Sequence, residues 1–506
     1  MELTELLQDV PVTEARCTKT HVSGITSDSR RVQGGELLIC IHGLHRDGHR
    51  FIPEGVARGA AVVLVETKEA LPPDVDYILT PDTRLAEALV WNNRYGRPAT
   101  AAHMTCIGIT GTSGKTTTAL LLRDLLMAGG KHVGSLTTVG GFVDRDSIPF
   151  PDGGTSVSDT AAAMTTPDPE YFYGTIAAMA KAGCDTLVYE ASSQGLAQRK
   201  TDAIVPDYAL FTNLTHEHMD QHGTMENYLT AKARLFAKAK TGILHGDDPW
   251  AKKLMERVPA CAWLTCTTDP AKFTECDGAA LRIRDHGEDG MSFLYCGKEA
   301  IFRIRTPLVG MCAVQNLLLT VTLALHMGMD PITIQRALHT AQPPVGRMQK
   351  LTLPKVPFAV YIDYAHTPAA LEMTLQTARA MHPGKLTVLF GCGGDRDPTK
   401  RPLMGHIAET WADRVVITDD NPRTEDPAAI REDIVAGMEK PPYAVIPDRR
   451  AAIEQCIGEA EVGEMLLLCG KGHESWQIIG QQKLPFSEEE IVREAVRKRF
   501  NDKHMP

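Results

Sequence analysis

The chain has 506 residues, of which 43% are hydrophobic and 23% charged, and its formal net charge is −10, from 53 Lys and Arg against 63 Asp and Glu. This length exceeds the roughly 250–300 residues at which a single hydrophobic core stops growing, so two or three domains are expected. The acidic balance gives no electrostatic reason to expect a nucleic-acid partner, and the composition excludes a disordered or collagen-like chain.

The start of the chain, MELTELLQDV, lacks the basic residues and long apolar stretch of a secretory signal. The longest apolar run, around residues 317–325, is about half of the roughly 18–20 residues that a membrane-spanning helix needs. The twelve cysteines are scattered singly without a CxxC pair, which favours reduced thiols over disulfides or a metal–thiolate site. We therefore expect a cytoplasmic protein without membrane insertion.

Short apolar runs alternate with segments of helical length along most of the chain. The clearest runs lie at residues 60–66, 104–109, 186–189, 385–390, 414–418 and 465–469. Such alternation predicts an α/β fold with mostly parallel sheets that are covered by helices. Breaks rich in Gly and Pro follow Tyr95 and begin at Pro343, and they separate three stretches. In parallel sheets ligands bind at the carboxyl ends of the strands, so the residues after each strand are the candidates for a site.

A glycine-rich loop, Thr110-Gly-Thr-Ser-Gly-Lys-Thr-Thr-Thr118, follows the strand at 104–109 and precedes a helical run at 119–126. Backbone N–H groups of such a loop close around phosphate oxygens, and the helix N-terminus adds favourable charge. Ile109 stands where the strict motif has its first glycine, but the context of strand, loop and helix predicts ATP or GTP binding. The residues that we assign to the nucleotide are Gly111, Thr112, Ser113, Gly114, Lys115, Thr116 and Thr117, with Lys115 on the terminal phosphates and the Thr116 hydroxyl on Mg²⁺.

Acidic residues and histidines follow the next two strands. Glu190 ends the strand at 186–189, where a carboxylate can bind the Mg²⁺ of a nucleotide, although a solvated or capping role is the commoner one. The loop after Phe211 contains three histidines and two acids, namely His216, Glu217, His218, Asp220 and His222. It is either a polar surface loop or a site for a divalent cation, and its spacing does not favour zinc.

The helix predicted over residues 226–236 carries a lysine within its apolar stripe. Lys232 falls among the apolar residues at 3–4 spacing, which are Tyr228, Leu229, Leu235 and Phe236. A lysine in such a place either reaches water along its aliphatic stem or remains desolvated, with a depressed pKa and an amine available for covalent chemistry.

The order of these motifs resembles the Mur ligase family of ATP-dependent amide-bond-forming enzymes, most of all its tripeptide synthetases, along nearly the whole chain. A single motif is weak, whereas this many in this order is highly specific. The matching segments are residues 28–30 with 47–48, 111–117, 165–167, 190–193, 213–223, 232, 346–347, 363–368, 391–402, 420–423 and 470–474.

The resemblance implies three domains: residues 1–98 for the uridine nucleotide, 99–340 with the P-loop ATPase-type sheet, and 341–506 with a Rossmann-like sheet that binds the amino acid. It also implies that CO₂ carbamylates Lys232, and that the carbamate and His218 hold one Mg²⁺ while Glu190 and Thr116 hold another. Lys115 completes this catalytic set. The same resemblance adds three residues to the ATP site, namely Asn316, Arg347 and Asp363.

The implied acid substrate is UDP-N-acetylmuramoyl-L-alanyl-D-glutamate. The positions that match its contacts are Ser29, Thr165, Thr166, Ser192, Gln198 and Lys200. Two positions depart from the family pattern, since Lys200 replaces an arginine and Gln194 a histidine. A lysine at residue 200 offers a point charge where the family has a bidentate fork. Residues 144–157 form a longer segment than usual, to which we assign no role.

Three strands of the last domain end in polar loops that are expected to converge: residues 391–396, 419–423 and 470–474. Taken alone, the Asp-Asn-Pro-Arg sequence indicates only a turn. In the family it marks the enzymes that add meso-2,6-diaminopimelate, whose extra carboxylate explains why an arginine is needed. The residues implied in binding this amino acid are Arg396, Asp420, Asn421, Pro422, Arg423, Gly470 and Glu474.

The implied reaction activates a carboxylate as an acyl phosphate, which an amine then attacks, and a monomer is expected. One alternative is a paralogous ligase that couples L-lysine or a secondary-metabolite substrate, which the substitutions at Gln194 and Lys200 leave open. A folate polyglutamate-type synthetase fits residues 420–423 and 470–474 less well. A non-ligase nucleotide-binding protein needs only the phosphate loop and leaves Lys232 unexplained.

Overall fold

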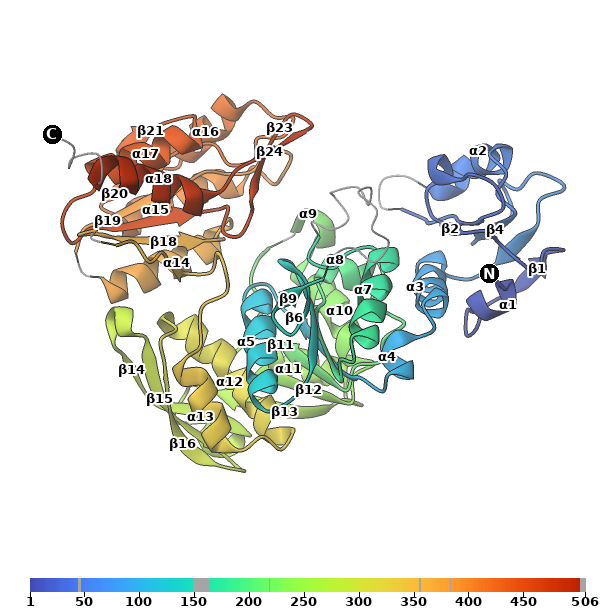
Figure 1. Ribbon diagram of the computed structural model, residues 1–506, viewed down its shortest axis with the longest axis horizontal. Coiled ribbons are helices and arrows are strands. Elements are labelled where there is room, and N and C mark those ends of the chain that lie inside the picture. The colour runs from blue at the N-terminus through green and yellow to red at the C-terminus, as the bar shows by residue number, and fades with distance from the viewer. Residues whose placement is uncertain (44–46, 149–163, 218, 355, 383, 501–506) are drawn as a thin grey trace.

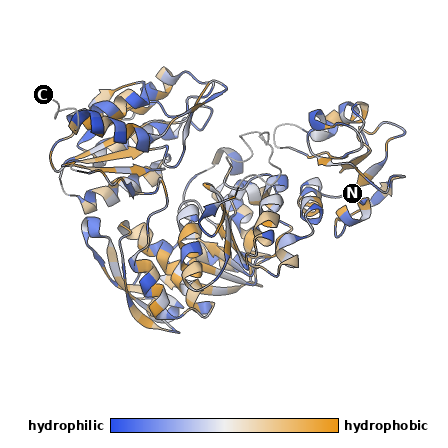
Figure 2. Ribbon diagram, in the orientation of Figure 1, coloured by the Kyte–Doolittle hydropathy of each residue, from blue (hydrophilic) through white to orange (hydrophobic). Residues whose placement is uncertain are grey.

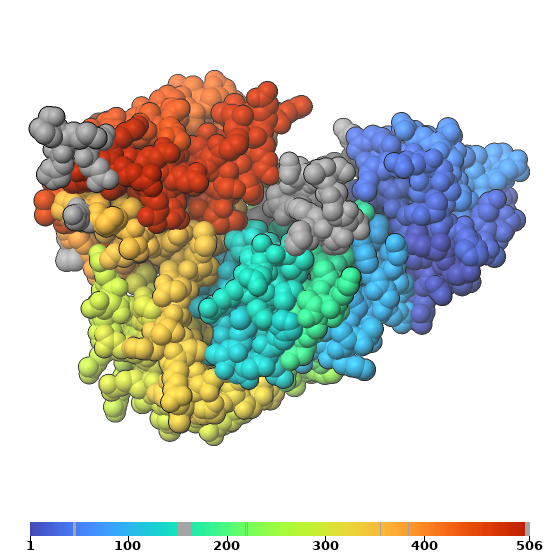
Figure 3. Space-filling view, in the orientation of Figure 1, coloured from blue at the N-terminus to red at the C-terminus, as the bar shows by residue number. Residues whose placement is uncertain are grey.

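The computed structural model describes residues 1–43, 47–148, 164–217, 219–354, 356–382 and 384–500. Three α/β domains follow one another along the chain (Figure 1), which confirms the predicted fold class. The N-terminal domain lies at one end of the central domain and the C-terminal domain covers another side of it. Figure 3 shows that, on this face, the first and last domains both contact the central domain and are separated from each other by a notch.

The N-terminal domain has a five-stranded sheet that is parallel except for its β1 edge. In order of pairing, the strands are β1 (Glu14–Arg16), β5 (Tyr77–Leu79), β4 (Val62–Val65), β3 (Leu37–Ile39) and β2 (Ile25–Thr26). The helices are α1 (Leu3–Leu6), α2 (Ile52–Ala57), α3 (Thr83–Arg94) and α4 (Pro98–Ala101), with the 3₁₀ turns η1 (Ser29–Arg31) and η2 (Gly48–Phe51). Asp82 caps α3 by accepting a hydrogen bond from the Leu85 N–H, and α3 packs against the central domain.

The central domain has an eleven-stranded sheet whose middle strands, from β14 to β7, are parallel and whose edges are antiparallel. In order of pairing, the strands are β16 (Ile301–Thr306), β15 (Met291–Gly297), β14 (Gly278–Asp285), β13 (Ala262–Thr267), β12 (Thr241–His245), β11 (Tyr208–Phe211), β6 (Thr105–Thr110), β10 (Thr186–Glu190), β7 (Val133–Thr137), β8 (Gly140–Val143) and β9 (Asp146–Ser147). The adjacent strands β6, β10 and β11 are almost entirely buried, as expected for parallel strands covered on both faces.

The helices of the central domain are α5 (Lys115–Ala128), α7 (Pro169–Lys181), α8 (Ser193–Ala197), α9 (Met219–His222), α10 (Met225–Phe236), α11 (Ala251–Arg257), α12 (Gly310–His326) and α13 (Pro331–His339), with the turns η3 (Phe273–Glu275) and η4 (Gly287–Asp289). The long apolar helix α12 packs against α5, which begins at the phosphate loop. The same helix α12 also contacts α14 (Pro368–Met381) of the C-terminal domain, so it lies between the phosphate-loop helix and that domain.

The C-terminal domain has a six-stranded sheet in which only β17 is antiparallel. In order of pairing, the strands are β17 (Gln349–Lys350), β18 (Ala359–Asp363), β22 (Met465–Cys469), β19 (Leu386–Phe390), β20 (Arg414–Ile417) and β21 (Ala444–Val445). The helices are α14 (Pro368–Met381), α15 (Lys400–Trp411), α16 (Pro427–Val435), α17 (Arg449–Glu459) and α18 (Glu488–Phe500), and a separate hairpin is formed by β23 (Trp476–Ile479) and β24 (Gln482–Pro485).

Apolar residues gather in the sheets and on the helix faces that cover them, as the orange segments in Figure 2 show. The twelve cysteines are all free. Within the described residues, no helix combines the length and the apolar character that crossing a membrane requires.

Candidate active site

The phosphate loop connects β6 to α5 through two glycines with positive φ. Gly111 has φ +151° and Gly114 has φ +83°, conformations that side chains disfavour. A Cβ on Gly111 would lie 1.8 Å from the Thr212 hydroxyl, and one on Gly114 would lie 2.8 Å from the Asn316 side-chain oxygen. The two glycines are therefore required both by the backbone and by close neighbours.

Residues at the end of β11 hold the backbone of the phosphate loop. The Asn213 side chain accepts a hydrogen bond from the Ser113 N–H at 3.0 Å and donates one to the Ser113 carbonyl at 3.1 Å. The Thr212 hydroxyl donates to the same carbonyl at 2.6 Å. The loop is thus preorganised by the neighbouring strand, as expected for the carboxyl edge of a parallel sheet.

Two lysine amines meet at the Gly111 carbonyl. Lys115 Nζ lies 3.1 Å from this oxygen and 2.8 Å from the Thr112 carbonyl, and Lys232 Nζ donates to the Gly111 oxygen at 2.7 Å. Burial lowers the pKa of Lys232 well below its usual value, and the charge of Lys115 lowers it further. Burial also lowers the pKa of Lys115. Of the two roles open to Lys232, the structure selects the desolvated amine, since the residue is 1% exposed.

Tyr228 connects Lys232 with the phosphate loop. Lys232 Nζ lies 4.3 Å from the centroid of the Tyr228 ring, and the Tyr228 hydroxyl lies 3.2 Å from the Thr112 hydroxyl. The two side chains are neighbours because they are four residues apart on α10. Tyr228 was expected only as part of the apolar stripe, so its contact with the loop was missed.

Glu190 ends β10 and lines the same cavity as the phosphate loop. Its carboxylate accepts hydrogen bonds from the Thr138 N–H at 2.9 Å and the Thr138 hydroxyl at 3.1 Å. These bonds fix the orientation of the carboxylate and leave acceptor capacity on both oxygens. Thr138, just after β7, had no sequence signal of its own, because its role depends on strand pairing.

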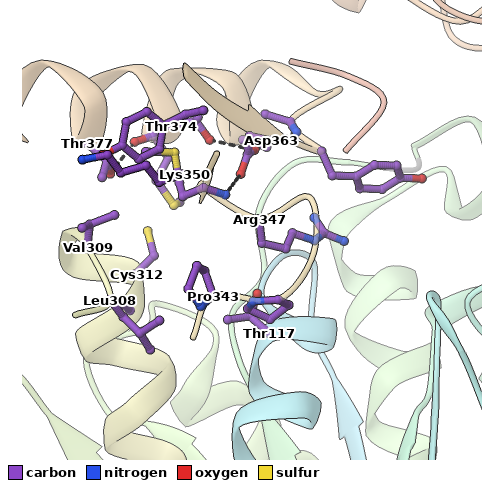
Figure 4. Close-up of a pocket in the computed structure, with 18 of the residues that line it drawn as sticks. Thr117, Leu308, Val309, Cys312, Pro343, Arg347, Lys350, Asp363, Thr374 and Thr377 are labelled. Carbon is purple, nitrogen blue, oxygen red and sulfur yellow. Dashed lines mark hydrogen bonds between the residues drawn. The ribbon is translucent and has the colours of Figure 1, made fainter. Parts of the chain in front are cut away.

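A cavity of about 1060 Å³ lies between the central and C-terminal domains. Figure 4 shows Leu308, Val309 and Cys312 on its central-domain side and Asp363, Thr374 and Thr377 on the opposite side. The predicted nucleotide residues on its wall are Thr112, Ser113, Gly114, Lys115, Thr116, Thr117, Asn316, Arg347 and Asp363, and Glu190 joins them. Residues more than 200 positions apart in the sequence therefore face one space.

Arg347 reaches from the C-terminal side toward the phosphate loop. One guanidinium nitrogen lies 3.5 Å from the Thr116 hydroxyl, and the guanidinium carbon lies 4.5 Å from the centroid of the Tyr364 ring. Asp363 accepts hydrogen bonds from the Met348 N–H at 2.7 Å and the Ala365 N–H at 2.8 Å, so it fixes the backbone that carries Arg347. Burial raises the pKa of Asp363.

The cavity also contains a histidine that sequence reasoning did not assign. His366 Nδ1 donates to the Tyr364 carbonyl at 2.8 Å, and the Lys400 amine donates to the His366 carbonyl at 2.9 Å. Burial, followed by the charge of Lys400, lowers the pKa of His366 to about 4. The imidazole is therefore neutral near pH 7.

Oxygen donors for a metal are present on the cavity wall. The Thr116 hydroxyl and the Glu190 carboxylate are oxygen ligands of the kind that Mg²⁺ takes. Within the described residues, no group of three or more His, Cys, Asp or Glu side chains could hold a metal ion. His218 lies outside the described residues, so the expectation that this histidine binds metal has no structural account.

Four of the six residues expected to bind the acid substrate lie close together. The Thr166 hydroxyl accepts a hydrogen bond from the Ser192 N–H at 2.8 Å, and the Thr165 hydroxyl forms a hydrogen bond of 3.1 Å with the Thr138 hydroxyl. Lys200 Nζ lies 3.4 Å from the Thr166 carbonyl and forms an ion pair of 2.8 Å with Asp168. The lysine at this position is therefore held by an acid of its own chain.

The other two residues are Ser29 and Gln198. Ser29 begins η1 in the N-terminal domain and donates to the Glu54 carboxylate at 3.2 Å. Gln198 is the C-cap of α8. Two ion pairs join the N-terminal and central domains: Arg199 with Asp82 at 2.7 Å, and Arg31 with Glu170 at 3.1 Å.

The three polar loops of the C-terminal domain do converge, and we call residues 391–396, 419–423 and 470–474 the three-loop cluster. The Gly394 N–H donates to the Asn421 carbonyl at 2.9 Å, and the Asn421 amide donates to Glu474 at 2.9 Å. A Cβ on Gly470 would lie 2.7 Å from the Asp420 carboxylate. The backbones approach this closely because glycines stand at the ends of two strands.

Two arginines of the three-loop cluster repel each other. The charge of Arg396 contributes to a lowered pKa of Arg423, after burial, which is the larger cause. The Arg423 guanidinium donates to the Gly394 carbonyl at 2.7 Å, and Arg396 donates to the Asp395 carbonyl at 2.9 Å. Both hydrogen bonds go to neutral carbonyls, and the carboxylates of Asp420, Glu474 and Asp395 partly offset the lowering of the Arg423 pKa.

Family models match three parts of the chain in sequence. The Mur ligase family catalytic domain matches residues 21–91, the Mur ligase middle domain matches residues 109–324, and the Mur ligase glutamate ligase domain matches residues 346–472. Together the three models cover most of the described structure.

Curated relatives match over almost the full length. The UDP-N-acetylmuramoyl-L-alanyl-D-glutamate–2,6-diaminopimelate ligase of Syntrophomonas wolfei is 38% identical over 98% of this chain and 97% of its own, and that of Geobacillus kaustophilus is 38% identical over 94% and 95%. A solved ligase of the same name aligns with TM-score 0.67 and 28% identity over 100% of both chains. Folylpolyglutamate synthase of Mycobacterium tuberculosis shares the fold, with TM-score 0.63 and 20% identity over 82% of this chain and 94% of its own. The chain therefore belongs to the Mur ligase family.

Proposed function

We propose that the protein is an ATP-dependent ligase that joins meso-2,6-diaminopimelate to UDP-N-acetylmuramoyl-L-alanyl-D-glutamate in peptidoglycan biosynthesis. The full-length relatives carry this activity in their names. The single observation that supports it best is the cavity that faces both the phosphate loop of the central domain and Arg347 and Asp363 of the C-terminal domain. A ligase needs such a shared space, because one domain activates the acid and the other delivers the amine.

ATP is assigned to this cavity, with its phosphates on the loop Gly111–Thr117. Arg347 lies near the Thr116 hydroxyl and is placed to contact the same phosphates, while Asn316 lies against Gly114. Backbone N–H groups at the start of α5 and the partial positive charge of this helix favour an anion there.

Mg²⁺ fits the oxygen donors of Thr116 and Glu190, and we assign it to them. Bound there, Mg²⁺ would offset the negative charge of the phosphates and of an attacking carboxylate. The carbamate of Lys232 is the further oxygen donor that we propose, since an ammonium cannot bind a cation. His218 stays in the proposed metal set on the family resemblance alone.

Carbamylation needs a neutral amine, and burial of Lys232 favours that form. The Lys232 nitrogen attacks the carbon of CO₂, a new N–C bond forms, and one proton leaves the nitrogen. The Gly111 carbonyl holds the nitrogen through a hydrogen bond of 2.7 Å, and Tyr228 covers one side of it. The product is an anion in a position where a protonated Lys232 would repel Lys115.

The first chemical step brings two anions together. An oxygen of the substrate carboxylate attacks the γ-phosphorus of ATP, the bond to the bridging β–γ oxygen breaks, and ADP leaves. Lys115 and Arg347, which both lie at the phosphate loop, are the residues that we propose to supply positive charge near the transferred group and so to lower this repulsion. The acyl phosphate that forms has to be protected from water, which the position of the cavity between two domains favours.

The second step forms the amide. The neutral amine of the amino acid attacks the acyl carbon, the bond to the phosphate oxygen breaks, and the nitrogen loses a proton. We place the amino acid at the three-loop cluster, where Arg423 and Arg396 bind a carboxylate and Glu474 binds the distal ammonium. Asp420, Asn421, Pro422 and Gly470 shape this site.

The acid substrate is proposed to span the N-terminal and central domains. Its contacts are Ser29, Thr165, Thr166, Ser192, Gln198 and Lys200. We place the domain limits at residues 1–98, 99–340 and 341–506, and we propose that the chain acts as a monomer in the cytoplasm. Lys200 has to leave Asp168 or bind the substrate together with it, because the two form an ion pair of 2.8 Å.

One assay tests the proposal directly. Phosphate release from ATP is measured with UDP-N-acetylmuramoyl-L-alanyl-D-glutamate and with diaminopimelate, lysine or ornithine as the amine. We expect release with diaminopimelate at a kcat/KM at least ~100-fold above that for lysine, the discrimination expected when a buried arginine loses its carboxylate partner. Preference for lysine would contradict the role of Arg423, and no stimulation by any of the three would support a paralogue with another substrate.

A further inference from the structure

A fully buried ammonium lies beneath the three-loop cluster. The Lys471 side chain has no exposed surface. Its Nζ donates to the Asn421 side-chain oxygen at 2.7 Å and the Trp476 carbonyl at 2.9 Å, and lies 3.3 Å from the Glu474 carboxylate. An ammonium has three hydrogens, so this set of acceptors satisfies it completely.

These contacts determine how Asn421 and Glu474 present their polar atoms. Lys471 fixes the Asn421 side-chain oxygen, and the Asn421 amide nitrogen consequently points to Glu474 at 2.9 Å. The Ile478 N–H donates to the same Asn421 oxygen at 2.9 Å. Lys471 thus orients two of the residues assigned to the amino acid without occupying the ligand site itself.

The hairpin formed by β23 and β24 holds the neighbouring Asp420–Arg423 segment. Gln477 donates to the Asp420 carbonyl at 2.7 Å. The Arg423 N–H donates to the Ile478 carbonyl at 3.1 Å, and the Gly480 N–H donates to the Arg423 carbonyl at 2.7 Å. The segment is therefore paired with the hairpin on both sides of Arg423.

This pairing explains an unusual backbone conformation. Arg423 has φ +52°, in the left-handed region that residues other than glycine rarely adopt. Such a conformation is strained and persists only where the surroundings fix it. Here the two hydrogen bonds to the hairpin fix it, and they direct the guanidinium to the Gly394 carbonyl in the neighbouring loop.

We propose that Lys471 is a positioning residue for amino-acid recognition, and that the β23–β24 hairpin is the frame that presents Arg423 and Glu474. This inference rests on the proposed function, because it concerns the amine substrate of that reaction. Without the buried ammonium, Asn421 loses a fixed partner and Glu474 loses its nearest positive charge. The distal ammonium of the ligand then meets a carboxylate that is no longer held in place.

The test substitutes Lys471→Met, which keeps the length of the side chain and removes its charge. We expect the KM for diaminopimelate to rise ~30-fold or more, as when a buried partner is removed, while the KM values for ATP and the acid substrate change less than about twofold. The acyl phosphate trapped by borohydride reduction in the absence of amine should remain within about twofold of the wild-type amount. Lys483→Met is the matched control, because Lys483 lies on the outer side of the same hairpin, 3.9 Å from the Trp476 ring centroid.

A second variant keeps the test decisive if Lys471→Met does not fold. Gln477→Leu removes the hydrogen bond to the Asp420 carbonyl and leaves the buried charge in place, and we expect a KM for diaminopimelate that is ~3–10-fold higher. An unchanged amino-acid KM in every variant that folds overturns the inference, as does an equal loss of ATP and amino-acid affinity. If the wild-type protein forms no amide with any amino acid, the proposed function fails instead.

Discussion

The phosphate loop and the three-loop cluster are both built at carboxyl ends of parallel strands, but different forces hold them. Gly111 and Gly114 shape the phosphate loop, and neutral side chains of the next strand hold its backbone. The three-loop cluster is held by a buried ammonium and by a hairpin that follows its third loop and pairs with the distant Asp420–Arg423 segment.

This difference matches the two ligands that we assign. Triphosphate is the same in every ATP-dependent enzyme, so a short local motif with fixed backbone N–H groups is sufficient to bind it. An amino acid with two carboxylates and two amines has to be distinguished from similar compounds, which requires charges at defined distances. Such distances come from tertiary contacts, and each contact is a separate point at which specificity can change.

The largest effect is expected at Lys232 in the phosphate-loop region. Lys232→Ala should lower kcat by ~1000-fold or more, because the proposed carbamate would be lost at a site of transition-state charge. Phosphate release measures the loss, and added short carboxylic acids should restore part of the activity.

Lys238→Ala is the control, since Lys238 follows the same helix and its amine pairs with Asp202 at 3.2 Å, outside the cavity. It should keep nearly full activity. A Lys232→Ala protein with wild-type kcat would exclude the carbamate from the mechanism.

Gly111→Ala should break the phosphate loop through sterics alone. The added Cβ would collide with the Thr212 hydroxyl at 1.8 Å in a backbone with φ +151°, so we expect a loss of ~2–4 kcal/mol in stability and much weaker ATP binding. Thermal unfolding with and without ATP measures both.

Gly130→Ala serves as the comparison, because Gly130 also has positive φ, at +85°, but has no atom near its Cβ position. It should cost only ~1 kcal/mol. Equal losses at the two positions would mean that the contact with Thr212 contributes nothing.

Arg423→Ala tests the three-loop cluster. We expect kcat/KM for diaminopimelate to fall ~100-fold, with a much smaller change for lysine, because only diaminopimelate presents a second carboxylate. Competition between the two amino acids in one reaction measures the change in preference. A uniform loss for both would show that Arg423 acts on stability and not on selection.

A pH effect is expected where the N-terminal domain meets the central domain. Burial raises the pKa of Glu87 from 4.5 to about 7, a hydrogen bond from Ser27 opposes this, and the charge of Asp168 adds to it. A raised pKa favours the folded state at low pH, so this contribution is complete below pH 4.5 and is lost as the pH rises through 7. Glu87→Gln should therefore stabilise the protein by ~1 kcal/mol at pH 8 and leave it unchanged at pH 4.5.

Melting temperatures of the wild-type and Glu87→Gln proteins between pH 4.5 and 8 test this expectation. Their difference should grow with pH. Parallel curves would show that Glu87 does not titrate in this range.

The smallest effect is expected for Gly393→Ala, which sharpens the contrast with Gly111. Its Cβ would lie 2.9 Å from the end of the flexible Arg423 side chain, which can move, so stability should change by less than ~0.5 kcal/mol. The displaced guanidinium should nevertheless raise the KM for diaminopimelate ~2–5-fold. A large loss of stability would show that Arg423 is held more rigidly than its contacts indicate.

The sequence by itself determined the α/β fold class and the phosphate loop, and it placed Lys232 within an apolar stripe without deciding whether its amine is buried. These features depend on local patterns: alternation of apolar runs, glycines before a helix, and an apolar stripe at 3–4 spacing. The motif at residues 420–423 was also visible, although it indicates only a turn when it is taken alone.

Only the tertiary structure decided which residues support these motifs. Three supporting contacts join elements that are distant in the sequence: Thr138 with Glu190, Tyr228 with the phosphate loop, and Lys471 with Asn421. Two further features are also tertiary contacts: the ion pair of Lys200 with Asp168, and the two domains that enclose one cavity. Hydrogen bonds and ion pairs act over a few ångströms, so their partners are fixed by strand order and domain packing, which no local pattern of residues specifies.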